Sequence, residues 1–566
     1  MAQQQNSNKR ALVIILPALI AGFATLLAAV LGDDQEQQAA RLPETARHGM
    51  VSSASAFATE AGVEILRSGG NAFDAFVGVA AVLNVTEPMM SGMGGYGTIM
   101  LYDAERGETH FLNSSGLIPR RVNSDVYRAP TPGYRENRRG AKAVSTPGNA
   151  NAWEAMWERF GEMEWADLFE RAIKLAEEGF ILDERTAGNI QSAFRSFPEH
   201  AQEFYGREGE PLGPGDRLMQ TDLGRSLRLI AEQGAGAFHG GELGEAVDRA
   251  MREAGGFLRL DDLAENEAEW YAPVSIDYRG YEIVTAPPPA NSFPALVRLG
   301  LMSRFDNRES GHNTVEFLHR FAEVTKHGFW TRLRYASDPL VSPVPLEMLL
   351  SQEYWQEQVD LIDPQRAKPF EYPGVITPEG KNTTHFVVAD QQGNVVSATQ
   401  TLGNAFGSRI MAEGTGIWLN NSLAYCTFEP KGNPMDAYPG RHKLSGDVPM
   451  IIMKDGRPWV VTGTPGGHTI GQTVPQMVMN MIDFDMDVLA AVTAPRISFV
   501  EPDVLVFEDG ISDDVVHTLR SFGHTIRTGG GLGLFHALTV EYNQQDMPVR
   551  FTGAADPRGT GLAKGY

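Results

Sequence analysis

The stretch from residue 384 to residue 401 constrains the fold of this chain more than any other part of the sequence. Short runs rich in β-branched and apolar residues cover 384–389 and 395–401, and a polar turn occupies 390–394. Runs of this length bounded by turn residues are typical of strands, and the short turn predicts that the two strands pair as a hairpin. The buried face of such a hairpin requires a second layer of structure against it.

The hairpin marks a change along the chain, because helical patterns dominate before it and strand patterns dominate after it. Helices are predicted at 60–67, 71–83, 165–179 and 477–484. The first of these is followed by Gly69-Gly70, which can adopt the left-handed conformation that ends a helix. A second hairpin is predicted from 449–453 and 459–462, around a Lys-Asp-Gly turn. We therefore expect an α/β protein in which sheets pack face to face, with helices outside.

Composition and motifs disfavour several classes of ligand. The formal net charge is −23, from 71 acidic and 48 basic residues, whereas a nucleic-acid surface needs clustered Lys and Arg. The glycine-rich segment 91–97 leads into a predicted strand at 98–102, whereas a phosphate-binding loop would lead into a helix. The single cysteine, Cys426, excludes a multi-thiolate metal site, and the 13 histidines show no HExxH spacing. We expect no nucleic-acid partner, no metal and no cofactor.

The N-terminal segment has the pattern of a targeting sequence. Lys9 and Arg10 precede an apolar run at 11–32, which ends at Asp33 and Asp34. A basic start and an apolar middle are typical of a secretory signal, and about 20 apolar residues are also enough to cross a bilayer. Residues 1–34 are therefore predicted to be either a cleaved signal peptide or a membrane anchor through 11–32. Both alternatives imply export, with the folded part in the periplasm or anchored to the cytoplasmic membrane and facing outward.

The candidate chemistry begins at Asn382-Thr383-Thr384-His385. A threonine hydroxyl is a poor nucleophile near neutral pH unless a base removes its proton, and a threonine at a chain start can use its own α-amine for this purpose. The reference pKa of an α-amine is about 7.7–8.0, so its neutral form is accessible. Thr383 could reach this state only if the peptide bond after Asn382 were broken. The tetrapeptide alone would more often be an ordinary strand start.

A longer comparison strengthens this interpretation. The run from Asn382 to Ser408 resembles the segment that begins the small subunit of γ-glutamyltranspeptidases. Further segments match the family in order and approximate spacing, namely 48–51, 69–75, 92–95, 419–421, 443–445, 461–467 and 556–558. The resemblance covers roughly residues 45–566. It implies a four-layer αββα sandwich of the N-terminal-nucleophile (Ntn) hydrolase type. It also implies self-cleavage between Asn382 and Thr383, giving a large subunit (45–382) and a small subunit (383–566) that form one αββα unit.

The resemblance assigns roles to individual residues. Thr383 resembles the nucleophile, and Thr401 resembles a second threonine whose hydroxyl contacts and tunes it. Gly466 and Gly467 resemble the pair whose backbone N–H groups form the oxyanion hole. A glycine there lets the backbone approach the reacting carbon closely, and one such donor is typically worth about 3 kcal/mol. Ser445 resembles the first of two serines that bind the substrate α-carboxylate.

The positions that would select a glutamyl group depart from the family pattern. The arginine that binds the α-carboxylate is replaced by Ser115, with Arg120 and Arg121 nearby but out of register. The other departures are Tyr425 in place of an aspartate, Gly446 in place of the second serine, and Gly403 in place of an Asn or Glu, although Asn404 follows. Charge-assisted contacts of the missing kind are worth about 1.5–3 kcal/mol each. The segment 426–443, which would cover the pocket, is also short for the family.

These observations leave three functions open. The first is a self-processing amidohydrolase or acyltransferase that cleaves γ-glutamyl amides such as glutathione through an acyl-Thr383 intermediate, with water or an amine as acceptor. The second is an amidase for another acyl group, as in cephalosporin-acylase-like or glutaryl-acylase-like members. The third is a non-catalytic envelope protein with the same fold. The expected partners are a small amide substrate and its acceptor, and the two subunits made from one precursor.

Overall fold

The computed structural model describes residues 43–128, 136–370 and 382–566. The predicted signal or anchor (1–34) lies outside these ranges. One compact unit spans Glu44–Tyr566. Within the described ranges, no helix is both long enough and apolar enough to cross a membrane.

Two large sheets form the centre of this unit, and each has seven strands. In order across the sheet, sheet I consists of β1 (Glu44–Ala46), β22 (Pro548–Ala555), β21 (His536–Tyr542), β17 (Arg457–Gly463), β16 (Met450–Lys454), β11 (Tyr281–Thr285) and β10 (Val274–Tyr278). Sheet II consists of β23 (Leu562–Gly565), β2 (Gly49–Ser53), β12 (Asn382–Asp390), β13 (Val395–Gly403), β3 (Tyr96–Asp103), β4 (Glu108–Asn113) and β9 (Glu269–Tyr271). Every pairing within them is antiparallel.

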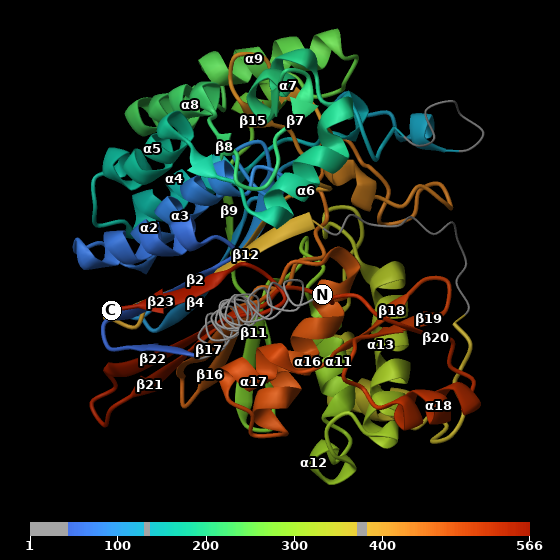
Figure 1. Cartoon of the computed structure of the whole chain (residues 1–566). Helices are drawn as coiled ribbons and strands as arrows, with labels where there is room; N and C mark the ends of the chain where they lie inside the picture. The colour runs from blue at the N-terminus through green and yellow to red at the C-terminus, as the bar shows by residue number, and fades with distance from the viewer. Residues whose placement is uncertain (1–42, 129–135, 371–381) are drawn as a thin grey trace, which may run out of the picture. The chain divides into compact units, whose positions relative to one another are not determined.

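The two sheets face each other, and helices cover their other faces (Figure 1). An apolar cluster that includes Met100, Val387, Ile451 and Leu538 fills the space between the sheets. Helices α2 (Ala56–Arg67) and α3 (Ala72–Thr86) contact β2, β12 and β13 of sheet II. Helices α11 (Phe293–Met302), α16 (Ile470–Ile482) and α17 (Val488–Thr493) contact strands of sheet I. The predicted α/β fold with sheets packed face to face is confirmed.

The remaining elements surround this centre. The other helices are α4 (Asn149–Phe160), α5 (Glu170–Glu178), α6 (Glu184–Ala193), α7 (Glu199–Tyr205), α8 (Thr221–Gln233), α9 (Glu242–Glu253), α10 (Leu260–Ala264), α12 (Asn307–Ser310), α13 (Val315–Tyr335), α14 (Leu346–Leu349), α15 (Gln352–Val359) and α18 (Asp513–Ser521). The small sheets are β5 (Phe180–Ile181) with β8 (Arg217–Leu218), β6 (Gly206–Arg207) with β7 (Glu210–Pro211), β14 (Met411–Ala412) with β15 (Ile417–Trp418), and β18 (Ile497–Val500), β19 (Val504–Phe507) and β20 (Ile526–Thr528).

Two details correct the sequence-based picture. Strands are not confined to the second part of the chain, because β2 and β4 join sheet II together with β3, which confirms the strand predicted at 98–102. The residues of β2 are buried on both faces, so its sequence lacks the alternation that identifies half-exposed strands. The helix predicted at 477–484 begins earlier, at Ile470, and contains Pro475. Packing against α11 and sheet I outweighs the one backbone hydrogen bond that this proline removes.

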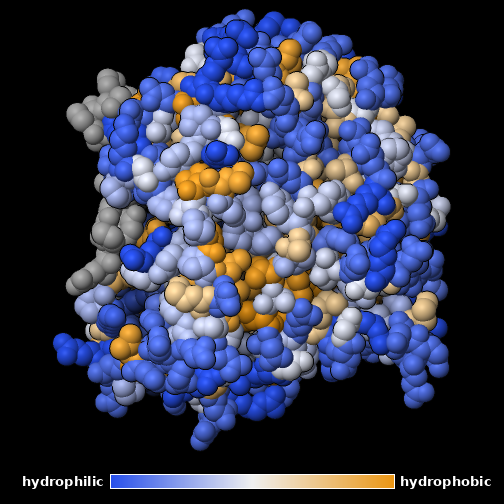
Figure 2. Space-filling model, turned by 180° about the vertical axis from the view of Figure 1, so that it is seen from behind, coloured by the Kyte–Doolittle hydropathy of each residue, from blue (hydrophilic) through white to orange (hydrophobic). Residues whose placement is uncertain are grey.

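The surface of the described unit is mainly hydrophilic on the face seen in Figure 2, with hydrophobic side chains gathered near the centre of that face. Large apolar side chains that remain exposed include Leu340 and Leu361. Scattered apolar side chains are normal on a soluble surface.

Candidate active site

The β12–β13 hairpin brings the two predicted threonines together. Asn382 pairs with Gly403 and Thr384 pairs with Gln400, so two residues of β13, Thr401 and Leu402, lie opposite Thr383 alone on β12. The Thr383 hydroxyl donates a hydrogen bond to Thr401 Oγ1 at 3.3 Å. Both side chains are only 1% exposed. The extra residue makes a bulge in β13, which can re-aim a side chain without interrupting the flanking strands, and the two threonines meet at this bulge.

The hydroxyl of Thr401 also contacts the peptide bond that would be cut. It donates to the carbonyl oxygen of Asn382 at 2.8 Å, and it accepts from the backbone N–H of Gly403 at 2.8 Å. Thr401 therefore touches both the predicted nucleophile and the carbonyl that this nucleophile would attack. A donor on that carbonyl oxygen can stabilise negative charge that develops there.

Thr384 is held by a pair of charges that sequence reasoning missed. Its hydroxyl donates to Glu87 Oε2 at 2.7 Å, and Arg185 Nη1 donates to Glu87 Oε1 at 2.8 Å. Glu87 is buried and directly follows α3, whereas Arg185 lies on α6. An acidic residue after a mainly apolar helix, just before a glycine-rich turn, is the signal that could have identified this support for the strand next to the bulge.

His385 lies near Thr383 but is committed to packing. Its Nδ1 lies 2.9 Å from Thr399 Oγ1, and the side chain is fully buried. Burial, with a smaller contribution from the nearby His536, lowers the pKa of His385 well below the usual histidine range. A side chain at Gly463 would collide with the His385 ring, because an added Cβ would lie 2.3 Å from its Cε1 atom. The neutral ring therefore fills the space between the two sheets.

Gly466 and Gly467 form the turn between β17 and α16, beneath the hairpin. Strand β17 contacts both β12 and β13, and Gly463 at its end lies against the ring of His385, two residues after Thr383. Gly466 has φ of +146°, and a Cβ there would lie 2.4 Å from Thr469 Oγ1. Only glycine fits such a position without strain. The turn leads through a short 3₁₀ segment, Gly467–Thr469, into α16.

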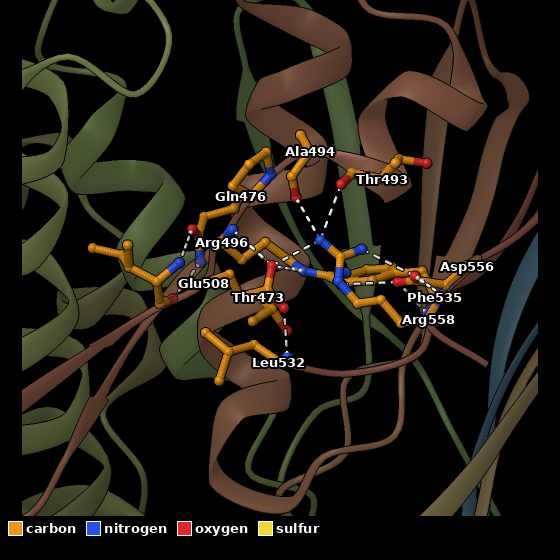
Figure 3. Close-up of polar contacts among 12 residues, drawn as sticks. Thr473, Gln476, Thr493, Ala494, Arg496, Glu508, Leu532, Phe535, Asp556 and Arg558 are labelled. Atoms are coloured by element: carbon orange, nitrogen blue, oxygen red, sulfur yellow. Dashed lines mark hydrogen bonds and ion pairs between the residues drawn. The ribbon is translucent and has the colours of Figure 1, made fainter. Parts of the chain in front are cut away.

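A cluster of buried charges holds the segment that packs against this turn (Figure 3). The cluster consists of Arg496, Glu508, Asp556 and Arg558. Its two carboxylates accept hydrogen bonds from the backbone N–H groups of Leu532 at 2.6 Å and Phe535 at 3.3 Å. Between these residues, the N–H of Leu534 donates to Thr464 Oγ1 at 2.8 Å. The Asp-Pro-Arg motif at 556–558 thus belongs to a charge cluster that holds the segment 532–535, which in turn contacts Thr464 just before the glycine turn.

Ser445 lies close to the same strands. Its Oγ is 3.0 Å from Thr98 Oγ1, and Thr98 pairs with Thr399 across β3 and β13. The carbonyl of Ser445 accepts from the backbone N–H of Asn291 at 2.7 Å. At the next residue, Gly446, an added Cβ would meet no atom within 4 Å. Open space is therefore present where a side chain of residue 446 would lie.

Tyr425 occupies the predicted aspartate position as part of an aromatic group. It ends a 3₁₀ segment, Ser422–Tyr425, and its ring meets that of Tyr96 edge-on at 6.5 Å between centroids. The ammonium of Lys443 lies 3.6 Å from the centroid of the Tyr96 ring and 4.5 Å from that of Tyr425. Tyr96 pairs with Thr401 across β3 and β13. Lys443 was matched to the family only as part of a motif, and its closeness to these rings was not predicted.

Ser115 and its neighbours show what replaces the expected arginine. Ser115 is buried just after β4, and its Oγ makes no hydrogen bond to any described residue. Arg120 does not substitute for the arginine, because its side chain is 53% exposed and donates to Glu265 Oε1 at 2.9 Å. Arg121 is exposed as well. Neither Arg120 nor Arg121 therefore contributes its side chain to this part of the site.

Asn404 lies at the end of the hairpin. Its backbone N–H donates to Asn421 Oδ1 at 2.8 Å, and the Asn421 side chain donates to the carbonyl of Arg138 at 2.7 Å. Gly403 before it has φ of +97°, and a Cβ there would lie 2.2 Å from Asn421 Oδ1. The sequence identified Gly403 only as a departure from the family pattern, and neither its backbone conformation nor the Asn421 contact was predicted.

The segment that carries Lys443 and Ser445 is held by an ionic triad. His442 Nδ1 lies 2.9 Å from Asp338 Oδ2, and His442 Nε2 lies 2.6 Å from Glu269 Oε2. Burial alone would lower the pKa of His442, but the two carboxylates outweigh burial and raise it to about 9. A narrow cavity of about 10 Å³, lined in part by Tyr425, His442 and Leu444, lies beside the triad and has room for about one water.

A possible metal-binding group lies elsewhere in the described unit. His319, Glu323 and His524 bring ligand atoms within 4.8 Å of one another. These atoms already have partners, since His319 Nδ1 lies 2.8 Å from His524 Nε2 and Lys326 Nζ lies 3.1 Å from Glu323 Oε1. His319 and Glu323 lie on α13, and His524 follows α18. None of the three is a predicted site residue.

Comparisons with a family model and with known proteins point to the same family. The γ-glutamyltranspeptidase family model matches residues 58–566. A glutathione hydrolase proenzyme from Escherichia coli (strain K12) is 34% identical over 544 residues, which cover 93% of each chain. An acylase ACY 1 proenzyme from Pseudomonas sp. (strain V22) is 35% identical over 539 residues, which cover 92% of this chain and 94% of the relative.

A solved structure agrees with these sequence relatives. The crystal structure of cephalosporin acylase from Bacillus halodurans superposes with a TM-score of 0.85 at 27% identity, covering 93% of this chain and 97% of that one. The relatives thus divide between glutathione hydrolases and acylases at similar identity. Taken with the threonine pair in the hairpin, these matches show that the chain belongs to the γ-glutamyltranspeptidase family of self-processing Ntn amidohydrolases.

Proposed function

We propose that this protein cuts itself between Asn382 and Thr383 and then cleaves a small amide through an ester on the Thr383 hydroxyl. The observation that carries the proposal is the hydrogen-bonded chain from Thr383 Oγ1 through Thr401 Oγ1 to the carbonyl oxygen of Asn382. Cleavage there would leave the proposed large (45–382) and small (383–566) subunits together in one four-layer αββα unit.

Self-cleavage proceeds by an acyl shift. The Thr383 hydroxyl oxygen attacks the carbonyl carbon of Asn382, and the Thr401 hydroxyl stabilises the negative charge on the carbonyl oxygen. The C–N bond then breaks, the Thr383 nitrogen takes up a proton, and Asn382 is left as an ester on Thr383 Oγ1. Water hydrolyses this ester, which releases the Asn382 carboxylate and regenerates the Thr383 hydroxyl beside the α-amine that the shift has freed. The new amine then supplies the base that the nucleophile lacked.

Turnover in the mature enzyme repeats this chemistry on a substrate. The α-amine of Thr383 takes the hydroxyl proton as the oxygen attacks the substrate amide, and Thr401 orients the hydroxyl. The backbone N–H groups of Gly466 and Gly467 bind the oxyanion, at about 3 kcal/mol for each donor. The amine product leaves with a proton, and water or another amine then removes the acyl group from Thr383.

We propose further that the acyl group lacks the free α-ammonium of a γ-glutamyl group. At the family's aspartate position, Tyr425 offers an aromatic ring instead of a carboxylate, so an ammonium would have no anionic partner there. The arginine position holds Ser115, and the second serine position holds Gly446. The acylase relative and the cephalosporin acylase structure support this choice.

A γ-glutamyl amide is the second candidate. Ser445, which matches a serine that binds the glutamyl α-carboxylate in the family, is retained next to Thr98. The identity to the Escherichia coli glutathione hydrolase is similar to that of the acylase. If the enzyme is not an acylase for a non-glutamyl group, these observations favour γ-glutamyl amides such as glutathione as its substrates.

Residues 1–34 are proposed to direct export, as a cleaved signal peptide or as an anchor. Intact-mass analysis of protein from the cell envelope reports signal removal and cleavage at Asn382-Thr383 in one measurement. A retained N-terminal segment in a membrane fraction would identify an anchor, whereas recovery of the full chain from the cytoplasm would contradict export.

The experiment that tests the reaction combines processing with two substrates. Purified wild-type protein should give two bands on a denaturing gel, whereas Thr383→Ala should give one band and Thr383→Ser should still give two. The processed enzyme should release p-nitroaniline faster from glutaryl-p-nitroanilide than from γ-glutamyl-p-nitroanilide. A single uncut band for the wild type would refute self-processing, and the reverse order of rates would select the γ-glutamyl alternative.

A further inference from the structure

We propose that Lys443 is a specificity-determining residue that binds an anionic group at the far end of the substrate's acyl chain. Its ammonium would take over, from a neighbouring segment, the role of the arginine that this chain lacks at Ser115. The favoured acyl groups are then those that carry a terminal carboxylate without an adjacent ammonium. This inference rests on the proposed amide cleavage through Thr383 and adds the residue that selects the acyl group.

The backbone places Lys443 next to the position of the missing arginine. The N–H of Lys443 donates to the carbonyl of Gly116 at 3.2 Å, and His442 forms an isolated β-bridge with Leu117. The segments 115–117 and 442–443 therefore run side by side. Replacing an arginine by Ser115 removes a positive charge from one of these segments, while Lys443 supplies a positive charge on the other.

The side chain of Lys443 is directed toward the reacting threonines by two aromatic rings. The ammonium lies over the ring of Tyr96 at 3.6 Å and over the ring of Tyr425 at 4.5 Å. A cation over an aromatic face is attracted by the ring quadrupole, and the attraction grows when water is excluded. Lys443 is 1% exposed, and Tyr96 is the strand partner of Thr401. A buried cation is thus positioned one side chain away from the Thr383–Thr401 pair.

Neutral hydrogen-bond donors near Lys443 complete an anion-binding arrangement. The Ser115 hydroxyl is buried and makes no hydrogen bond to a described residue. A buried hydroxyl without a partner is costly, and a carboxylate oxygen would satisfy it. The Ser445 hydroxyl lies two residues after Lys443 in the chain, 3.0 Å from Thr98 Oγ1, and a Cβ on the following residue, Gly446, would meet open space. A carboxylate in this space could accept from both hydroxyls and from the ammonium.

The same arrangement disfavours a γ-glutamyl group. The α-ammonium of such a group would sit near its α-carboxylate and therefore near the ammonium of Lys443. The family's aspartate would neutralise this repulsion, but Tyr425 stands in its place. A dicarboxylic acid monoamide has the carboxylate without the ammonium, so it gains the attraction and avoids the repulsion.

The segment carrying Lys443 is rigid enough to discriminate. His442 is fixed on both ring nitrogens by Asp338 and Glu269. On the other side of Lys443, the Ser445 carbonyl accepts from Asn291. A cation held between two anchored residues loses little conformational freedom when an anion binds, and this preorganisation strengthens selectivity.

The test compares two acyl groups of the same shape on processed enzyme. Glutaryl-p-nitroanilide carries the carboxylate, and its carboxamide counterpart is neutral. Lys443→Met and Lys443→Gln should lower kcat/KM for the glutaryl substrate by about 10- to 100-fold, as expected for a lost charge-assisted hydrogen bond, and change kcat/KM for the carboxamide less than about 3-fold. Lys443→Glu should invert the preference toward a 5-aminopentanoyl substrate. Self-cleavage of each variant reports that it has folded.

A matched control lysine lies on the surface. Lys454 is exposed at the end of β16, and its ammonium lies 5.8 Å from the ring centroids of both Tyr281 and Trp459. Lys454→Met removes a cation from two aromatic rings, Tyr281 and Trp459, that are not part of the proposed anion site, and it should leave both kcat/KM values unchanged. Equal losses on the glutaryl and carboxamide substrates in Lys443→Met would overturn the inference.

Binding separates this inference from the proposed reaction. Calorimetry with glutarate and with pentanoate on processed wild-type enzyme and on Lys443→Met does not depend on turnover. Tighter glutarate binding that is lost in Lys443→Met would support the anion site even if none of the amides were cleaved, in which case only the proposed function would fail. Normal turnover with equal binding of glutarate by both proteins would refute the role of Lys443 and leave the proposed function intact.

Discussion

The two ends of the candidate site are built in different ways. The reacting end consists of neutral hydroxyls on paired strands, with Thr383 and Thr401 held by the β12–β13 register. The acyl end consists of irregular segments around 115–117, 425 and 442–446, where charges and aromatic rings dominate. Strand register fixes the first arrangement wherever the hairpin forms, whereas loop residues can change without disturbing the fold. The reaction type and the substrate preference are therefore separable properties of this molecule.

Removal of the nucleophile should have the largest effect, because it affects the reaction whatever the acyl group of the substrate. Thr383→Ala should abolish self-cleavage and lower turnover of every amide by about 10⁴-fold or more, because no other group in the site forms the acyl ester. The measurement is the gel pattern together with p-nitroaniline release from glutaryl and γ-glutamyl substrates. Thr383→Ser keeps a hydroxyl and should still process. Residual processing in Thr383→Ala would mean that the bond is cut by another group.

Loss of the second hydroxyl should give a smaller effect of the same kind. Thr401→Val keeps the shape but removes the hydrogen bond to the Asn382 carbonyl, so the rate of self-cleavage should fall by about 10²- to 10³-fold. Thr399→Val is a matched control on the same strand, because Thr399 bonds to His385 and does not contact the scissile peptide. The rate is followed by the disappearance of the full-length band after refolding. Equal slowing in both variants would show that general damage to the strand is responsible.

The sequence places Thr383 and Thr401 near each other for a physical reason. A strand hairpin is encoded locally, through short runs of strand-forming residues and turn residues, and Thr383 and Thr401 lie in that one local element. The Glu87–Arg185 support and the Asn421 contact could not be predicted, because each joins segments far apart in the chain. The acyl end shows the same limit. Ser115 and Tyr425 were identified as departures, but only the folded chain places Lys443 between Tyr96 and Tyr425.

Restoring the family's charges should move substrate preference without changing the reaction. Tyr425→Asp combined with Ser115→Arg introduces the carboxylate and the guanidinium that bind a γ-glutamyl group. The ratio of kcat/KM for γ-glutamyl-p-nitroanilide over glutaryl-p-nitroanilide should rise by about 10- to 100-fold, which corresponds to one charge-assisted contact. Self-cleavage should proceed as in the wild type. An unchanged ratio in a fully processed double variant would place the determinants of specificity outside these residues.

The smallest expected effect concerns the anchor of the acyl end, and it depends on pH. The carboxylates of Asp338 and Glu269 raise the pKa of His442 to about 9, from about 6.5 in the unfolded chain. The folded state therefore holds this proton more tightly, so the triad contributes its full stability below about pH 6.5 and loses it as the pH rises through 9. His442→Gln in an uncut Thr383→Ala background should be less stable than its parent by about 2–3 kcal/mol at pH 6.5.

The urea midpoints of the two proteins should converge by about pH 9.5, where His442 would be neutral in the parent as well. Comparing the difference between the proteins removes the contribution of other groups that titrate in the same range. A difference that stays constant between pH 6.5 and 9.5 would show that hydrogen bonding alone, without the proton on His442, holds the segment. In that case the charge at the acyl end would come from Lys443 alone, and the contrast between a neutral reacting end and a charged acyl end would depend on this lysine.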